Sequence, residues 1–376
     1  MQPESVRTRP PILFAAAPAR GRAFAEKWRG ARPKFACVLG HTDICMVSGL
    51  SSAGVSEELR PLTPAADAEV VDLGQALCLP VLPSNPLGAP GPAGITRAAL
   101  RLADIQASFF GAGLRVWPAT ACVRLADDPG GDVRLGRAVP RAHHLFELGL
   151  KIGKELAQEA PYVVLGESVP GGTTTALAVL LALGFAAEGR VSGSMPGNAH
   201  VLKGQVVAAA LDAAGLARSD GRRDPLGAVA AIGDPMQPAL AGLALGAVSA
   251  GCDVLLAGGS QMLAVAALVE ALHGSAALER IAIGTTRWIV QDSSADIAGL
   301  AAEISPDLPI LAVNLDFSSS RHAGLRAYEQ FQVKEGVGAG GACVAALLGS
   351  DVTLERLETE IDATYDSLLG RLQLTN

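Results

Sequence analysis

The sequence predicts an α/β protein built on a doubly wound, mostly parallel sheet with helices on both faces. Three observations lead to this prediction. Short apolar runs alternate with stretches of helical periodicity, which is the pattern of βαβ units. Glycine, alanine, leucine and valine dominate the composition, which suits helices packed on a buried parallel sheet. The chain has 376 residues, of which 49% are hydrophobic, enough for one large domain or two domains.

The first third of the chain gives a weak pattern. Residues 1–34 are basic and proline-rich, and we expect a loosely held arm there. Residues 35–40 form an apolar run that predicts a buried strand ending in a polar turn. Residues 60–95 contain many prolines, which is typical of a linker or an irregular lid. A helix is expected over residues 95–105.

From about residue 142 the pattern becomes regular, and each apolar run or periodic stretch predicts one element. We expect helices over 173–186, 201–216, 261–272 and 293–304, and strands over 162–165, 253–257, 281–284 and 309–315. Residues 354–372 carry a leucine-rich stripe opposite acidic residues, the pattern of an amphipathic helix. That helix either packs on the protein's own core or forms a dimer contact.

Charge and cysteine content exclude several classes of function. The net charge of −7 disfavours binding to a nucleic-acid backbone. The six cysteines form no CxxC pair, so we expect free thiols in a reducing compartment and no zinc site. No signal peptide and no clean apolar span of about 20 residues is visible. We therefore expect a cytoplasmic protein with no membrane partner.

A first glycine-rich segment, residues 166–176, follows the strand expected at 162–165. It contains Glu167 and Ser168, then Gly171 and Gly172, and then threonines, and it leads into a helix. Glycines before a helix start allow backbone N–H groups to approach an anion. The segment lacks the lysine of a Walker A loop and the spacing of a GxGxxG fingerprint. A plain structural turn is the alternative interpretation.

A second glycine-rich segment, residues 334–341, reads Lys-Glu-Gly-Val-Gly-Ala-Gly-Gly. Its single carboxylate, Glu335, lies among residues with almost no side chain. Burial in a glycine-lined pocket would raise the pKa of this carboxyl into the range useful to a general base. A solvated loop glutamate is the alternative.

Other segments offer weaker candidates. Gly258 and Gly259 follow a predicted strand, at the edge where parallel sheets bind ligands. Ser320 and Arg321, with His322, follow the last predicted strand, where they can hold a phosphate or a ribose. His322 can equally be a capping or surface residue. No recognisable Ser-His-Asp arrangement and no GxSxG motif is present.

Together these residues resemble a known family, the nicotinate-nucleotide:dimethylbenzimidazole phosphoribosyltransferases of cobalamin nucleotide-loop assembly, in a divergent branch. Gly166-Glu167 through Thr173-Thr174 is similar to the family's Gly-Glu…Gly-Asn-Thr-Thr segment. Residues 335–339 resemble its Glu-Gly-Thr-Gly-Ala segment. Gly233-Asp234 and residues 255–259 occupy the places of two further ligand-facing glycine turns, and Ser320-Arg321-His322 resembles a Ser-His-Arg stretch.

The resemblance implies an activity and a set of site residues. It implies transfer of phosphoribose from nicotinate mononucleotide to a benzimidazole-type or purine-type base, without a cofactor or a metal, by a homodimer. Glu335 is then the catalytic base. The substrate-binding residues that it implies are Glu167, Ser168, Gly171, Gly172, Thr173, Thr174, Gly233, Asp234, Gly258, Gly259, Ser320, Arg321, Lys334, Gly336 and Gly338.

The resemblance also implies a Rossmann-like sheet with a smaller domain built from the chain ends. We place an arm and part of the small domain at 1–110, the nucleotide-binding domain at 111–335 and the closing helices at 336–376. Val169, Gly172 and Val337 differ from the family's glycine, asparagine and threonine. These differences leave two alternatives: a non-catalytic nucleotide- or base-binding protein of this fold, or a phosphoribosyltransferase for another base such as adenine.

Overall fold

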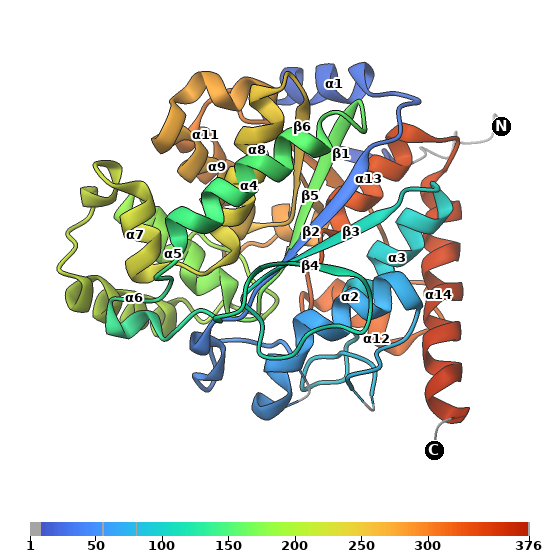
Figure 1. The fold of residues 1–376 in the computed structure, drawn as a ribbon. Coiled ribbons are helices and arrows are strands. Elements are labelled where there is room, and N and C mark those ends of the chain that lie inside the picture. The colour runs from blue at the N-terminus through green and yellow to red at the C-terminus, as the bar shows by residue number, and fades with distance from the viewer. Residues whose placement is uncertain (1–8, 55, 80, 375–376) are drawn as a thin grey trace.

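The computed structural model describes residues 9–54, 56–79 and 81–374, with side chains described through residue 370. An eight-stranded sheet crosses the molecule in the order β1-β8-β7-β6-β5-β2-β3-β4 (Figure 1). The strands are β1 (Ile12–Ala16), β2 (Lys34–Leu39), β3 (Ala107–Ala112), β4 (Cys122–Ala126), β5 (Tyr162–Ser168), β6 (Asp253–Ala257), β7 (Ile281–Thr286) and β8 (Ile310–Val313).

The predicted mostly parallel sheet is confirmed. Every neighbouring pair of strands runs parallel except β1 and β8, which are antiparallel. Val163, Leu255, Ile283 and Ala312 lie in β5, β6, β7 and β8, as their apolar runs predict. All four side chains are completely or almost completely buried, because helices cover both faces of the sheet.

Helices cover the two faces of the sheet in two groups (Figure 1). One face and its outer layer carry α4 (Ala142–Leu156), α5 (Gly172–Ala182), α6 (His200–Ala214), α7 (Pro225–Ile232), α8 (Met236–Ser249), α9 (Ser260–His273) and α11 (Ile297–Ile304). The other carries α2 (Thr63–Leu73), α3 (Ala93–Leu102), α13 (Ala339–Gly349) and α14 (Leu354–Leu374). Two one-turn helices complete the set, α10 (Arg287–Val290) and α12 (Ala323–Arg326).

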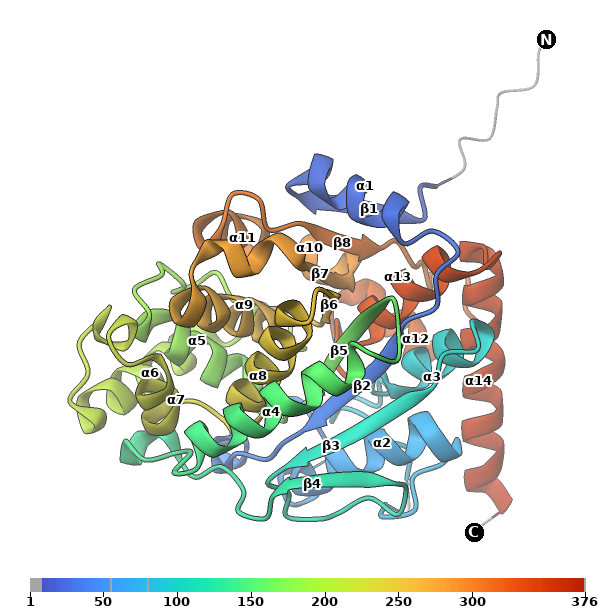
Figure 2. The same ribbon diagram turned by 45° about the horizontal axis from the view of Figure 1, so that its top comes forward.

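The N-terminal segment is not the loosely held arm that its composition suggests. Strand β1 pairs with β8 at the sheet edge, and helix α1 (Pro18–Lys27) follows it (Figure 2). The ammonium of Lys27 and the indole N–H of Trp28 both bond to the carboxylate of Asp253 on β6. The expectation of a loose arm is therefore wrong for residues 9–34, and residues 1–8 lie outside the described part.

The proline-rich stretch at 60–95 contains a buried helix, α2, that the sequence did not predict. Prolines lie near its start, where a missing N–H costs little. Most of its alanines and valines are buried against the sheet and α3. Residues 83–92 then form an irregular loop with one isolated bridge, between Ser84 and Pro90. Strands β3 and β4 were also not predicted.

The C-terminal helix α14 packs on the protein's own core, which was the first of the two interpretations of its stripe. Leu357, Ile361, Tyr365 and Leu368 are buried, and the helix contacts α3. The division of the chain into domains at residues 110 and 335 stays a prediction.

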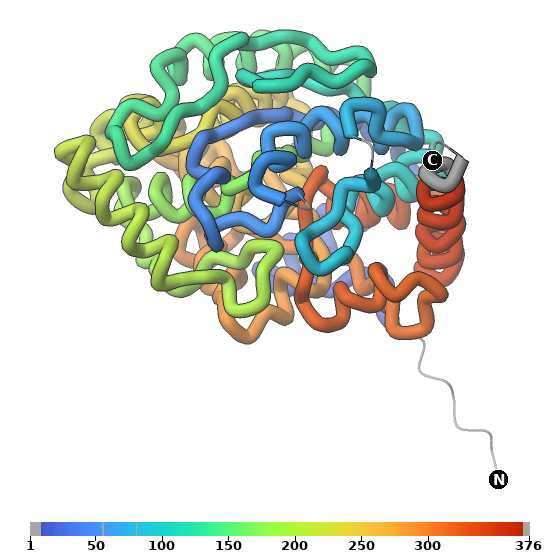
Figure 3. Tube along the Cα trace, turned by 90° about the horizontal axis from the view of Figure 1, so that it is seen from below, coloured from blue at the N-terminus to red at the C-terminus, as the bar shows by residue number. Residues whose placement is uncertain are grey.

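The strand order defines where a ligand can enter the sheet. From β2 the chain builds outward through β3 and β4, and from β5 it builds in the opposite direction. The crevice between the carboxyl ends of β2 and β5 is the usual binding position in such folds. Seen from below in Figure 3, the blue segment around residue 50, the cyan loop at 81–92 and the orange-red segment at 330–337 gather in one region.

Candidate functional site

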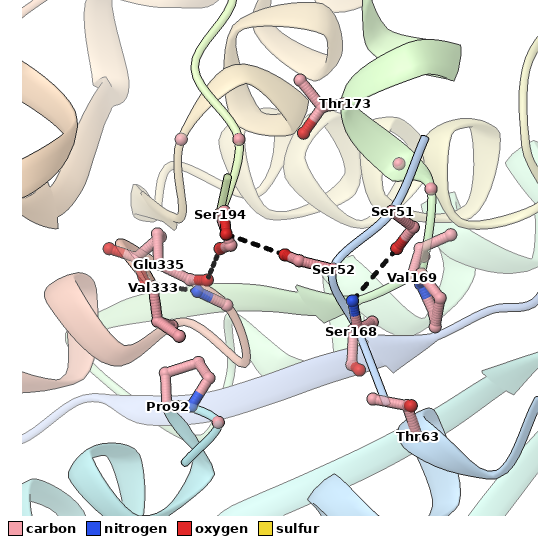
Figure 4. Close-up of a pocket in the computed structure, with 18 of the residues that line it drawn as sticks. Ser51, Ser52, Thr63, Pro92, Ser168, Val169, Thr173, Ser194, Val333 and Glu335 are labelled. Atoms are coloured by element: carbon pink, nitrogen blue, oxygen red, sulfur yellow. Dashed lines mark hydrogen bonds between the residues drawn. The ribbon is translucent and has the colours of Figure 1, made fainter. Parts of the chain in front are cut away.

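A cavity lies beyond the carboxyl end of β5, at the crevice just described (Figure 4). Its wall comes from segments far apart in the sequence, with single contributions from Thr63, Asp67, Lys203 and Ile289. The segments are residues 50–54, 83–85, 91–92, 167–173, 192–195, 259–261, 333 and 335–337. Many of these residues are glycines or serines, so backbone groups and hydroxyls form much of the wall.

Glu335 enters this cavity just before the start of α13. Its carboxylate accepts hydrogen bonds from the N–H of Gly340, at 3.0 Å, and of Gly336, at 3.2 Å. The hydroxyl of Thr285 on β7 donates to its other oxygen, at 3.3 Å. Burial raises the pKa of Glu335 to about 7, although these donors oppose the rise. A carboxyl with this pKa is poised to accept a proton near neutral pH.

Glu167 lies at the end of β5 and faces the same cavity. The two glycine-rich segments also touch, because the N–H of Val337 donates to the carbonyl oxygen of Glu167 at 2.9 Å. Burial, together with the negative charges of Asp234 and Glu335, raises the pKa of the Glu167 carboxyl to about 8. A cationic ligand would relieve this repulsion.

Asp67 adds a third carboxyl to the wall. It comes from α2, and its Oδ2 accepts a hydrogen bond of 2.7 Å from the hydroxyl of Ser168. Burial raises its pKa to about 7, while the Ser168 hydroxyl opposes the rise. The acidic half of the cavity therefore holds Asp67, Glu167 and Glu335.

The opposite half of the cavity combines a helix start with a buried lysine. Gly171 has a φ of 84°, a left-handed conformation that favours glycine, and it turns the chain into α5. Gly172 and Thr173, the first two residues of α5, line the cavity. Lys203 brings a buried ammonium from α6. Burial and the nearby positive charge of Lys334 together lower the pKa of this ammonium to about 8. A helix start beside a lysine attracts phosphate.

Lys334 points away from the cavity wall, although it precedes Glu335. Its ammonium bonds to the carboxylate of Asp292 at 2.6 Å, and also to the carbonyl of Met195 and the side chain of Asn198 at 3.1 Å each. Asp292 also accepts bonds from Ser192 and Asn198. Burial alone would raise the pKa of Asp292, but these bonds hold it well below its usual range. The network fixes the loop that brings Gly193 and Ser194 to the cavity.

A second buried network aligns two helix starts. Asp234 accepts bonds from the hydroxyl of Thr175 on α5, at 2.5 Å, and from the amide of Gln261 on α9, at 2.8 Å. The side chain of Gln261 lies against Gly172, where an added methyl group would be only 2.2 Å from its nitrogen. Asp234 thus holds the glycine turn in place from behind.

The structure brings half of the predicted site residues into one wall. Those that line the cavity are Glu167, Ser168, Gly171, Gly172, Thr173, Gly259, Glu335 and Gly336. Those outside its lining but adjoining it in the chain or packed behind it are Thr174, Gly233, Asp234, Gly258, Lys334 and Gly338. The binding role of each residue stays a prediction.

Ser320 and Arg321 do not belong to this wall. The hydroxyl of Ser320 donates to Asp362 on α14, at 2.5 Å, and Arg321 forms an ion pair with Asp366 one turn later. Their side chains, their position after the last strand and the resemblance to a Ser-His-Arg stretch had suggested a ligand role. The acidic face of α14 engages them instead.

The relatives of this chain are close and nearly full-length. The UPF0284 protein of Gloeobacter violaceus is 46% identical over 373 residues, which cover 97% of this chain and 96% of the relative. The UPF0284 protein of Methanothermobacter thermautotrophicus is 43% identical over 339 residues, covering 89% and 93%. The chain belongs to the UPF0284 family. No family model matches the sequence.

The fold of this UPF0284 protein is also known from solved structures. CobT from Thermus thermophilus aligns with a TM-score of 0.60 and 17% identity, over 95% of this chain and 92% of that one. A nicotinate-nucleotide-dimethylbenzimidazole phosphoribosyltransferase from the same organism gives a TM-score of 0.56 at 17% identity, over 93% and 91%. The predicted resemblance to that family is confirmed in the fold.

Sequence reasoning missed several residues of the UPF0284 cavity. Asp67 and Lys203 are single charged residues inside helices, and neither has a local motif. The loops at 51–54 and 192–194 do carry a signal, since both consist mainly of serine and glycine. They also touch, because Ser52 donates to the carbonyl of Ser194 and Ser194 donates to that of Glu335 (Figure 4).

The described residues offer neither a metal centre nor a membrane span. Among them, no group of three or more histidine, cysteine, aspartate or glutamate side chains could hold a metal ion. Within the same part of the chain, no helix is long and apolar enough to cross a bilayer.

Proposed function

We propose that this protein transfers phosphoribose from nicotinate mononucleotide to a nitrogenous base, releasing nicotinate. One observation carries the proposal: a single cavity has an anion-binding half and an acidic half. The substrate pair has matching ends, since the donor carries a phosphate and a cationic pyridinium and the acceptor carries an acidic N–H. The fold shared with a phosphoribosyltransferase of this type supports the assignment.

The donor phosphate binds at the start of α5 in this proposal. Thr173, with its backbone N–H and its hydroxyl, and Lys203, with its ammonium, line this half and supply the donors. They lie close together, since a methyl group placed on Gly193 would be 2.8 Å from the Thr173 hydroxyl and 3.4 Å from the Lys203 nitrogen. The ribose then extends toward Glu167, whose carboxylate stabilises the positive charge that develops on the sugar ring.

Glu335 serves as the base in this proposal. Its carboxylate takes the N–H proton of the acceptor, and the freed nitrogen pair forms a bond to C1′ of the ribose. The bond from C1′ to the pyridinium nitrogen breaks, and its electron pair returns to nicotinate, which leaves as a neutral pyridine ring. Departure of this group needs no acid. Base catalysis of this kind contributes about 10²–10⁴-fold in rate.

The decisive experiment is to incubate the purified protein with nicotinate mononucleotide and a panel of bases and to measure released nicotinate. We expect base-dependent release by the wild type, and release reduced at least about 10²-fold in Glu335→Gln. Glu355→Gln, an exposed position on α14, is the matched control and keeps full activity. Binding of both substrates with no release by the wild type would contradict the proposal and favour the non-catalytic alternative.

A further inference from the structure

Helix α2 presents two polar side chains to the acidic half of the cavity. Thr63 and Asp67 are four residues apart, so they lie on one face of the helix. Asp67 is only 4% exposed. Thr63 and Ser168 both line the cavity in Figure 4, and the hydroxyl of Ser168 bonds to Asp67. The two side chains therefore form one polar strip on an otherwise alanine-rich helix.

This strip has hydrogen-bonding capacity that the protein does not use. The Oδ2 atom of Asp67 is engaged by Ser168, but Oδ1 accepts no hydrogen bond from the residues that the structure describes. The hydroxyl oxygen of Thr63 is buried and likewise has no partner among them. Most buried polar side-chain atoms in proteins have a partner. The Thr63 hydroxyl is such an exception, and with the unused acceptor of Asp67 in the same cavity wall it indicates a ligand that supplies the missing bonds.

The strip lies on the acceptor side of the cavity. A methyl group placed on Gly91 would be 3.9 Å from Oδ1 of Asp67, and one placed on Gly336 would be 2.9 Å from the ring of Pro92. The segment Gly91–Pro92 therefore lies between Asp67 and the loop that carries Glu335. The hydroxyl of Tyr365 holds this segment in place through the carbonyl of Gly91, at 2.6 Å.

We propose that Thr63 and Asp67 recognise the edge of the acceptor base farthest from the nitrogen that is glycosylated, and that they select a purine-type base carrying an amino group. Asp67 accepts a hydrogen bond from the amino group, and the Thr63 hydroxyl donates to the neighbouring ring nitrogen. Dimethylbenzimidazole presents methyl groups at that edge and would leave both side chains unpaired. This inference rests on the proposed function, because it assigns the acceptor of that same site.

Direct binding of bases tests the inference without relying on turnover. Isothermal titration calorimetry at about pH 8.5, where carboxyl groups are ionised, compares adenine, hypoxanthine and dimethylbenzimidazole. Hypoxanthine has a carbonyl oxygen where adenine has its amino group. We expect the wild type to bind adenine at least about tenfold more tightly than either other base, because each of the other bases leaves a polar group without a hydrogen-bond partner.

The variants then test each side chain. Asp67→Asn keeps an acceptor for Ser168 and turns an amide N–H₂ toward the base. We expect its affinity for adenine to fall by about tenfold or more, its affinity for hypoxanthine to rise and its affinity for dimethylbenzimidazole to stay unchanged. Thr63→Val keeps the shape of the side chain and removes the hydroxyl. We expect it to weaken the binding of adenine and not that of the other two bases. Asp72→Asn, an exposed position on the same helix, is the control.

Several outcomes would overturn the inference: equal losses for all bases in Asp67→Asn, unchanged adenine binding in both variants, or no binding of any base by the wild type. Failure of the proposed function looks different. The expected binding pattern without nicotinate release would reject the transferase and leave base recognition by α2 standing.

Discussion

Replacing Glu335 with glutamine is expected to stabilise the folded protein above neutral pH while it removes activity. The carboxyl of Glu335 has its pKa raised by burial from the usual 4.5 to about 7. Between these two values the folded protein binds a proton that the unfolded chain has released. Stability of the wild type therefore falls as pH rises from about 4.5 to about 7 and stays reduced at higher pH. A glutamine at this position has no such dependence.

The size of the effect follows from the pKa difference. A pKa that rises from 4.5 in the unfolded chain to about 7 in the folded protein lowers the free energy of unfolding by about 3 kcal/mol once the pH is above both values. Between pH 5 and pH 8 we expect about 2 to 3 kcal/mol of it. Glutamine also loses about 1 kcal/mol, because its amide N–H₂ replaces the oxygen that accepts hydrogen bonds from Thr285 and Gly340. That loss is the same at both pH values, so it does not affect the comparison.

Urea unfolding at pH 5 and pH 8 measures this directly. We expect the free energy of unfolding of Glu335→Gln, relative to the wild type, to rise by about 2 to 3 kcal/mol between the two pH values. The same comparison for Glu355→Gln, on the exposed side of α14, should show no comparable rise. A constant difference between Glu335→Gln and wild type at both pH values would refute the claim that this site perturbs the carboxyl.

Further predictions concern binding, stability and assembly. Lys203→Met should weaken nicotinate mononucleotide binding about tenfold or more in calorimetry, whereas exposed Lys151→Met should not. Lys334→Met should lower the free energy of urea unfolding by about 3–5 kcal/mol, because Asp292 keeps a buried charge without its partner; a loss below about 1 kcal/mol would contradict this. Glu167→Gln should reduce both donor affinity and turnover in steady-state kinetics, and an unchanged KM would count against its place beside the donor. Sedimentation at micromolar concentration should show a homodimer, and a monomer would reject that prediction.

The sequence led to the central carboxylates because their neighbours carry a strong local signal. Glu167 and Glu335 each sit among glycines, and each segment precedes a helix start. Strands alternating with helices place the ends of parallel strands at one edge, so the fold class alone brings Glu167 to the crevice. The contact between Val337 and Glu167 then joins the two segments. The sequence thus predicted the two glycine-rich turns and the edge of the sheet on which they lie.

The remaining site residues depend on tertiary packing. Asp67 is joined to the cavity through Ser168 on β5, a distant part of the chain, and its own segment shows only a high proline content. Lys334 was grouped with Glu335 as a ligand residue, but successive residues of an extended chain point to opposite sides. Ser320 and Arg321 were misplaced because the carboxylates that bind them lie on a helix some 40 residues later in the chain.

The hydrogen bond from Tyr365 to Gly91 has a consequence for the order in which the protein is made. The wall that bounds the acceptor half is encoded early, at 83–92, but the side chain that fixes it belongs to the last helix, α14. Tyr328 adds a second late anchor through the carbonyl of Pro90, at 2.9 Å. A nascent chain can therefore assemble β2 to β5 long before its acceptor wall is set. Base recognition is expected to be among the last properties that the growing polypeptide acquires.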